Sequence, residues 1–334
     1  MNKFLSSSLV VLLIMSFASC KDSNTKKGEE VHDTVVAPPA LSIPKFNADT
    51  AYAYVEKQVS FGFRTPGSPG QAACADWMEG KLKAFCDTVY RQQTTVIGGD
   101  KKQLRCINLI GVIHPEAKRR VLLLAHWDSR PWADEDTKDK DKPILAADDA
   151  GSGVAVLLEL ARTLKGQPLP KDLGVDILLT DVEDYGRSEW GEASYCLGTQ
   201  YWATHPHVPG YTANFGILLD MVGAKNARFP LEQSSTQYAQ NVQQNVWQAA
   251  ARAGFSSFFP PVHSRGGVTD DHVYVNELAH IPTIDIINLS EGTRSGFAPH
   301  WHTHNDNMDI ISKETLNAVG QTLLQVLFET ANPS

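Results

Sequence analysis

VLLLAHWD, at residues 121–128, is a run of five apolar residues that ends in His126-Trp127-Asp128. A short apolar run of this kind is typical of a buried strand in a parallel sheet. Two further strand-like runs, at 175–180 and 215–221, also end in or lead into acidic residues. Because open α/β sheets form their sites at the carboxyl ends of strands, the sequence predicts polar side chains gathered along one edge of a sheet.

Helical spacing of apolar residues separates most of the later strand-like runs. Strands that alternate with helices predict an α/β fold, with a mixed, mostly parallel twisted sheet and helices on both faces. The first two strands are expected to form an antiparallel edge, and Asn47 and Ser68 are placed as helix caps. The predicted strands are 88–96, 106–113, 121–125, 175–180, 215–221 and 283–287, and the predicted helices are 47–60, 68–85, 154–164, 195–203, 237–253 and 313–330.

The N-terminal region has the layout of a bacterial export signal. Lys3 precedes an apolar run, and the small residues before Cys20 resemble the lipobox of lipoprotein precursors. We therefore expect a signal peptide at 1–19, a lipid on Cys20, and a polar, proline-containing tether over 20–46. The alternative is an ordinary signal peptide with a chance cysteine. The expected location is the periplasm, with the protein anchored to a bacterial membrane through its lipid only.

Residues 47–334 are expected to form a single α/β domain, because their apolar content suffices for one core and no second linker interrupts them. The net charge of −8 argues against a nucleic-acid partner, which demands a basic face. The alternating charges of DEDTKDKDK, at 134–142, are typical of a solvated loop. The spacing of the remaining cysteines matches no zinc motif and leaves open whether they pair; they are Cys74, Cys86, Cys106 and Cys196.

Three polar clusters become informative when they are taken together. Glu183-Asp184 alone could be an acidic helix start, Asp148-Asp149 alone could cap a helix, and one histidine of His300–His304 alone could be a half-buried polar group. Together they offer one histidine and two carboxylates, which are three protein ligands for zinc with a fourth position open for catalysis. No HExxH, GxSxG or phosphate-binding glycine loop competes as an alternative centre.

The order of these clusters resembles the co-catalytic zinc aminopeptidases across almost the whole domain. Within that clan, three segments resemble the glutaminyl-peptide cyclotransferases of animals and some bacteria. These segments are LLDMVGA at 218–224, TDDHV at 269–273 and WHTHNDN at 301–307. The resemblance implies a zinc aminopeptidase-like (phosphorylase/hydrolase-like) fold.

Carried over residue by residue, the resemblance implies one zinc per chain, bound by Asp149, Asp184 and His302. Asp149 stands ten residues before Glu159 of LLELA, as in the family. Glu183 would be the general acid/base. The protein departs from the animal enzymes in having Glu183-Asp184 where they have Glu-Glu, which shortens one ligand by a methylene.

The resemblance also assigns the residues around the zinc. Asp220 and Asp271 match aspartates that bond the substrate and the catalytic glutamate, and Trp301 matches a wall of the glutamine pocket. Trp190 matches another wall only if the alignment takes a one-residue gap. His126 and Asp220 match the residues that bind a second zinc in the two-metal peptidases. They are therefore either functional ligands or vestigial ones. For His126 the alternative is a hydrogen bond that fixes the loop around Asp128. The disulfide flanking the animal active site is excluded, because Ala125 and Val154 stand in place of its cysteines.

The function that this resemblance implies is cyclisation of the N-terminal glutamine of peptides and proteins to pyroglutamate, with release of ammonia. A two-zinc exported aminopeptidase and a non-catalytic peptide-binding lipoprotein are the alternatives. The partners expected are peptide substrates, and the protein is expected to be a monomer.

Overall fold

The computed structural model describes residues 41–290 and 292–332. The predicted signal peptide, Cys20 and most of the predicted tether lie outside the described residues. The end of the tether is already part of the packed domain: Phe46 is buried, and the Gln321 side chain bonds the amide of Phe46 and the carbonyl of Pro44, each at 3.0 Å. The packed domain therefore starts a few residues before position 47.

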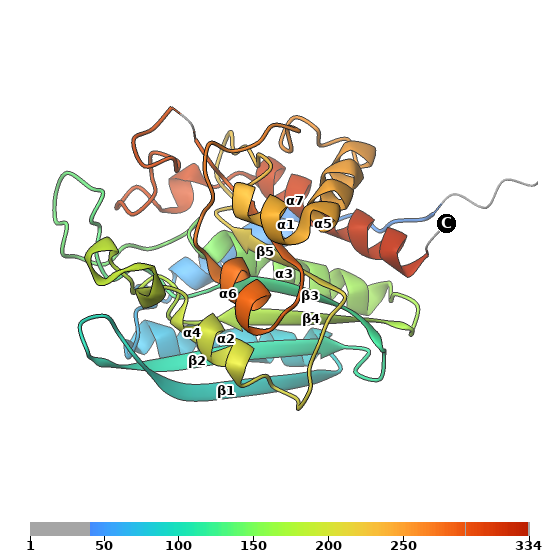
Figure 1. Ribbon diagram of the computed structural model, residues 1–334, viewed down its shortest axis with the longest axis horizontal. Coiled ribbons are helices and arrows are strands. Elements are labelled where there is room, and N and C mark those ends of the chain that lie inside the picture. Colours follow the sequence, from blue (N-terminus) through green and yellow to red (C-terminus); the bar gives the residue numbers. More distant parts are fainter. Residues whose placement is uncertain (1–40, 291, 333–334) are drawn as a thin grey trace, which may run out of the picture. The chain divides into compact units, whose positions relative to one another are not determined.

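A six-stranded sheet with the order β1-β2-β4-β3-β5-β6 forms the centre of the domain (Figure 1). Strands β1 and β2 pair antiparallel at one edge, and β2 also runs antiparallel to β4. The pairings of β4 with β3, β3 with β5 and β5 with β6 are parallel, which confirms the predicted mixed sheet. The strands are β1 (Thr88–Ile97), β2 (Gln103–Ile113), β3 (Arg119–His126), β4 (Leu173–Thr180), β5 (Phe215–Asp220) and β6 (Thr283–Ile287).

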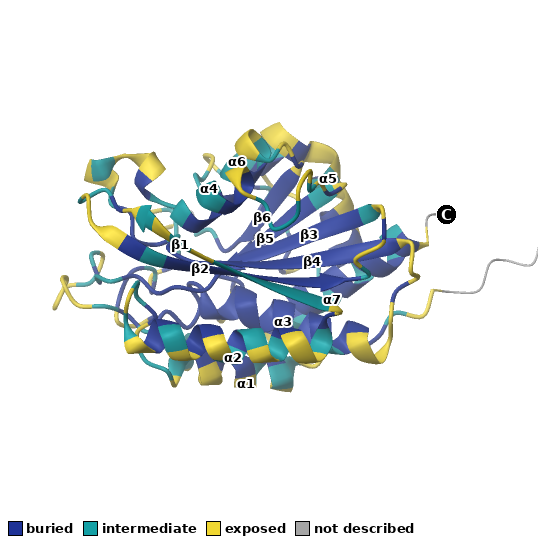
Figure 2. Ribbon diagram, turned by 90° about the horizontal axis from the view of Figure 1, so that it is seen from below, coloured by how far each residue is buried: buried dark blue, intermediate teal, exposed yellow. Residues whose placement is uncertain are grey.

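Helices cover both faces of this sheet, as Figure 2 shows. One face carries α1 (Ala48–Val59), α2 (Pro69–Phe85), α3 (Gly151–Gly166) and α7 (Lys313–Ala331). The other face carries α4 (Leu197–Thr204) and α6 (Asp271–Leu278), and α5 (Gln233–Arg252) packs on both β6 and α7. Short 3₁₀ turns occur at η1 (Ser188–Trp190), η2 (Glu192–Ser194) and η3 (Met308–Ile310).

The helix starts show where local sequence signals suffice and where they do not. The predicted caps are confirmed, because the side chains of Asn47 and Ser68 accept from the amides of Thr50 and Gln71. Helix α6 was not predicted, since the predicted helices include none between residues 253 and 313. It has only eight residues, and its cap Asp270 accepts from the amide directly after it.

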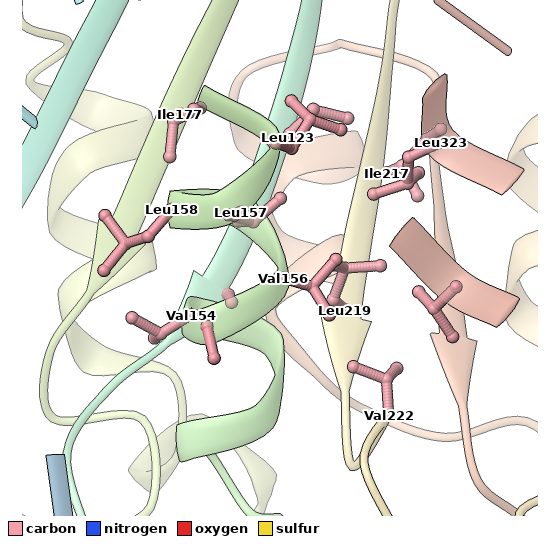
Figure 3. Packing of buried hydrophobic residues seen from close by; sticks show 14 of the residues in the cluster. Leu123, Val154, Val156, Leu157, Leu158, Ile177, Ile217, Leu219, Val222 and Leu323 are labelled. Carbon is pink, nitrogen blue, oxygen red and sulfur yellow. The ribbon is translucent and has the colours of Figure 1, made fainter. Parts of the chain in front are cut away.

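Helix α3 lies at the centre of the main core, and its packing determines where the residues just before it lie relative to the strand ends. Its buried side chains Val154, Leu157 and Leu158 pack against side chains of β3, β4 and β5 (Figure 3). At its start, a Cβ on Gly153 would meet the Leu219 carbonyl oxygen at 2.5 Å, so the helix can approach β5 only with glycine here. This close approach holds the residues before α3 directly over the ends of the central strands.

The described residues resolve two further points that the sequence left open. Cys74, Cys86, Cys106 and Cys196 are buried with free thiols. Among the helices of residues 41–290 and 292–332, none is long and apolar enough to cross a bilayer.

Candidate active site

The carboxyl ends of the parallel strands and the loop before α3 bring the predicted site residues together. His126 and Asp220 are the last residues of β3 and β5, and Glu183-Asp184 follows β4. Asp149 comes just before α3, and His302 lies in the segment after β6. Residues up to 176 positions apart in the sequence (126 to 302) thus meet at one edge of the sheet.

Asp149, Asp184 and His302 form a buried trio, each with at most 4% of its surface exposed. One ligand atom from each lies within 4.8 Å of the other two. The His302 Nε2 atom is 3.3 Å from Asp184 Oδ1 and 3.7 Å from Asp149 Oδ2. The structure therefore brings together the three residues predicted as zinc ligands.

The donor chemistry of this trio fits a divalent metal. Two carboxylates and one imidazole are a common ligand set of catalytic zinc. Asp184 Oδ2 is buried and has no hydrogen-bond partner among the described residues, although a buried carboxylate oxygen is costly to leave unpaired. A metal ion held by the trio would give this oxygen a partner.

His126 occupies the centre of a second cluster that shares Asp149. Its Nε2 atom lies 3.0 Å from Asp149 Oδ1 and 3.3 Å from Asp220 Oδ1, and its Nδ1 atom lies 3.4 Å from Asp128 Oδ1. Burial lowers the pKa of His126, but the hydrogen bonds to these three aspartates outweigh it and raise the pKa well above its usual range. One ligand atom each from His126, Asp149 and Asp220 lies within 4.8 Å of the other two, which is close enough to hold a metal ion.

Glu183 lies beside the trio with 12% of its side chain exposed. Burial raises the pKa of its carboxyl well above the usual range; His126 lowers it, and the neighbouring Asp184 raises it further. The buried thiol of Cys196 donates to Glu183 Oε1 at 3.2 Å, and the amide of Cys196 donates to the Glu183 carbonyl at 2.9 Å. The sequence alone indicated no role for Cys196, because nothing in its spacing pointed to a contact with the acid.

The aspartates of β5 and α6 surround Glu183 on its other side. Burial and Asp149 raise the pKa of Asp220 to about 7, against the hydrogen bond from His126. Asp270 lines the small cavity described below, whereas Asp271 accepts from the Thr180 hydroxyl at 2.8 Å and is fully buried. Burial raises the pKa of both Asp270, the cap of α6, and Asp271, its first residue.

Two residues that the sequence did not assign to the site hold the ligands from behind. Arg130, which is buried, donates to Asp184 Oδ1 at 2.7 Å and to both carboxylate oxygens of Asp134. Asp134 in turn lies 3.4 Å from His302 Nδ1. The prediction of a solvated loop at 134–142 is thus wrong at its start, although Lys138–Lys142 is exposed. Partners of this kind fix the orientation of metal ligands.

Only one histidine of the 300–304 segment faces the trio. His300 Nε2 bonds Asp148 Oδ2 at 2.9 Å, and His304 Nδ1 bonds Asp136 at 2.9 Å. The carboxylate of Asp306 accepts from the amides of Asp148 and Asp149 at 2.7 and 3.1 Å. The flanking residues of the segment therefore hold the loops on which the ligands stand.

Two adjoining cavities open beside the trio. The smaller has a volume of about 70 Å³ and is lined by Glu183, the trio and Trp301, among others. The indole of Trp301 stacks on His302, with ring centroids 3.6 Å apart, and on Phe297 at 4.4 Å. Trp301 therefore walls the cavity, as predicted.

The predicted second tryptophan wall is not where the resemblance placed it. Trp190 packs against Gly99 and the rings of Trp132 and Tyr185, and it lines neither cavity. Tyr195, which lines both cavities, stands five residues further along the sequence. The resemblance matched Trp190 only with a one-residue gap in the alignment, and this is the match that the structure does not support.

A mixed α/β sheet that carries a buried three-ligand metal site at its strand ends, with a free carboxylate beside it, is the arrangement of the aminopeptidase-like metalloenzymes. The sequence model of peptidase family M28 matches residues 108–327, and the protein belongs to this family. The family assignment agrees with a zinc-dependent site.

The known proteins that resemble this one are named either as glutaminyl cyclases or as zinc-dependent peptidases. The glutaminyl cyclase of Bacteroides thetaiotaomicron bound to N-acetylhistamine is 46% identical, with a TM-score of 0.83 over 86% of this protein and 99% of that one. A Zn-dependent exopeptidase of Parabacteroides distasonis is 47% identical, with the same TM-score and the same coverage. The glutaminyl-peptide cyclotransferase of Gloydius blomhoffii is 26% identical over 300 residues, 80% of this protein and 78% of that one.

Proposed function

We propose that this protein is a glutaminyl cyclase, which converts the N-terminal glutamine of peptides to pyroglutamate and releases ammonia. The observation that carries the proposal is the small cavity. At about 70 Å³, with Trp301 as a wall and Glu183 and the trio in its lining, it suits one planar side-chain amide. The 46% identity to the Bacteroides thetaiotaomicron glutaminyl cyclase supports the same activity.

The reaction forms a bond between the α-amino nitrogen and Cδ of the glutamine, and the bond between Cδ and the amide nitrogen Nε2 breaks. Glu183 takes a proton from the α-amine and delivers it to the departing nitrogen, which leaves as ammonia. Burial raises the pKa of Glu183 well above its usual range, which suits a carboxyl that both takes up and returns a proton. Because both reacting groups belong to one residue, holding them in place supplies much of the acceleration.

The metal part of the proposal is one zinc ion per molecule, held by Asp149, Asp184 and His302. When bound, zinc supplies a Lewis acid that polarises the γ-carbonyl. The count of one ion follows the resemblance to the one-zinc cyclases. His126, Asp149 and Asp220 also lie close enough together to hold a metal ion, so a measurement of zinc per molecule tests the count.

Asp220 and Asp270 line the small cavity and hold the substrate beside Glu183, in place of the predicted Asp271, which lies fully buried behind them. One aspartate of the group, Asp220 or Asp271, is protonated so that it donates to its neighbour. An amide can donate in the same way as a protonated acid. Asp271→Asn is therefore expected to keep most of the activity and its pH profile, whereas Asp271→Ala loses both. An inactive, folded Asp271→Asn variant would count against this arrangement.

The test of the function is ammonia release from a short peptide with N-terminal glutamine, with the loss of free amine measured in parallel. We expect release that stops on zinc chelation and in Glu183→Gln, and that continues in the matched control Glu189→Gln, whose carboxylate is exposed. A folded, zinc-loaded protein that released no ammonia would refute the proposal.

A two-zinc aminopeptidase is the second candidate, favoured by the shared Asp149 between the two histidine clusters and by the similarity to a Zn-dependent exopeptidase. The two candidates differ in metal content and product. Two zinc ions per molecule together with release of free amino acids from peptides would replace the cyclase with this candidate.

The proposed location is the periplasm, with the protein attached to a membrane by a lipid on Cys20, and the proposed assembly is a monomer. Support comes from the sequence around Cys20. Cys20→Ala is expected to move the protein from the membrane to the soluble fraction with its activity intact. Unchanged fractionation, or a dimer in sedimentation, would contradict the respective point.

A further inference from the structure

A further group of buried ligand-type side chains lies where α6 packs against β6. Its members are Asp270 and His272 at the start of α6 and Asp285 in the middle of β6. One ligand atom from each lies within 4.8 Å of the other two. His272 and Asp285 are fully buried, and Asp270 has only 5% of its surface exposed. The group thus lies inside the protein, and Asp270 is its one member that lines the small cavity.

Several polar atoms of this group are buried without a hydrogen-bond partner among the described residues. They include Asp270 Oδ2, both carboxylate oxygens of Asp285 and Nδ1 of His272. Native proteins rarely leave buried polar atoms unpaired, because each one costs about 1 to 3 kcal/mol. A proton shared by the two carboxylates would pair one oxygen of each, but it would leave the imidazole nitrogen and the other Asp285 oxygen unpaired. A metal ion binds an atom of all three side chains at once.

The orientation of His272 is that of a metal ligand. Its Nδ1 atom lies 4.0 Å from Asp285 Oδ2, which is too far for a hydrogen bond and about the sum of two metal–ligand bonds of roughly 2.0 to 2.2 Å each. Its other ring nitrogen, Nε2, lies 3.3 Å from Glu232 Oε2. Glu232 is fixed in turn by the amides of Ser234 and Ser235, at 2.7 and 2.6 Å. Histidines that bind metal ions commonly direct their second ring nitrogen at a carboxylate in this way.

We propose that Asp270, His272 and Asp285 bind a structural divalent transition-metal ion such as zinc, in addition to the ion held by the trio. One imidazole and two carboxylates are donors that zinc accepts, whereas calcium and magnesium take oxygen ligands. The ion joins the start of α6 to the centre of β6, and it thereby fixes the aspartate that forms part of the small-cavity wall. Because His272 and Asp285 do not line that cavity, the ion site is independent of the proposed function.

The experiment measures zinc per molecule by elemental mass spectrometry, after the protein is loaded with zinc and the excess is removed. All variants carry His302→Ala, which removes a ligand of the trio and so separates the two sites. Adding Asp285→Asn should lower the zinc content by about one ion per molecule. Adding Asp172→Asn is the matched control, because it makes the same change on an exposed residue just before β4, at the opposite end of the strands from the site. This control should leave the zinc content unchanged.

Crystals of the unmodified protein grown with zinc give a second measurement, which does not depend on the folding of a variant. Diffraction data at the zinc absorption edge should show an anomalous peak between Asp270, His272 and Asp285, besides the peak at the trio. A peak at the trio alone, or equal zinc content in the folded Asp285→Asn and Asp172→Asn proteins, would overturn the inference and leave the cyclase in place. Both peaks in a protein that releases no ammonia would support the ion site and refute the proposed function.

Discussion

Arg64 connects the two loops that carry the site, and replacing it tests whether those loops depend on one buried side chain. Its guanidinium, which is fully buried, donates to the carbonyl oxygens of Trp127, Leu145 and Ala146 at 2.8 to 2.9 Å. Trp127 lies at the end of β3, and Ala146 lies three residues before Asp149. The arginine thus fastens the loop before α3 to the end of the central strand.

The cost of Arg64→Met follows from the carbonyl that it leaves unpaired. The carbonyl of Trp127 belongs to a fully buried residue, and an unsatisfied buried acceptor costs about 1 to 3 kcal/mol. The Ala146 carbonyl still accepts from the amide of Gly151 at 3.2 Å, and Leu145 is only half-buried, so water can replace its partner. The expected loss of unfolding free energy is therefore about 1 to 3 kcal/mol, out of a total of about 5 to 15 for a typical domain.

Urea unfolding followed by tryptophan fluorescence measures this loss, with a chelator present so that bound zinc contributes nothing. Arg252→Met is the control: it removes an exposed ion pair with Glu329 and should cost about 1 kcal/mol or less. A loss for Arg64→Met as small as that of the control would refute the reasoning, since the Trp127 carbonyl would then have another partner.

Three further substitutions test the contacts around the site. Cys196→Ala removes the thiol donor to Glu183 and should lower kcat about fivefold, with Cys196→Ser closer to the unmodified protein; unchanged kcat would contradict the contact. Asp134→Asn should weaken zinc binding about 10- to 100-fold in chelator competition, and equal affinity would show that Asp134 does not orient His302. Glu232 caps α5. Burial raises the pKa of its carboxyl, but His272 and the backbone amides that donate to it outweigh burial and lower the pKa to about 2. Glu232→Gln should therefore cost about 3 kcal/mol above pH 5, a difference that should vanish as the pH falls towards 2, and a pH-independent difference would refute this account.

Most of the fold could be predicted because its strands are short apolar runs that end abruptly in polar residues. The strand at 283–287 was placed at its observed bounds, and the other strands differ by three residues or fewer at either end. Helix α6 was missed, because a helix of eight residues that begins with two polar side chains after a polar cap has too little apolar spacing to stand out.

The site was predictable where a residue type and a strand end coincide, as at Asp184 and Asp220, and where the family motif was continuous, as at His302. It was not predictable where a contact joins distant segments of ordinary composition. Arg130 meets Asp184 across 54 residues. Arg130 stands only two residues after Asp128, but nothing in the sequence indicates that its guanidinium turns towards Asp184.

The charge distribution of the site gives the proposed function its physical basis. Five carboxylates line the small cavity, and the raised pKa values of Glu183, Asp220 and Asp270 follow from burying so many acids together. A divalent cation at the trio offsets part of this repulsion, and the amino group of a substrate offsets more. A peptide is thus oriented with its amine towards the acidic cavity before any bond changes. Acetylation of the N-terminal amine removes both the nucleophile and the charge that the acidic cavity attracts, so one modification defeats both chemistry and binding.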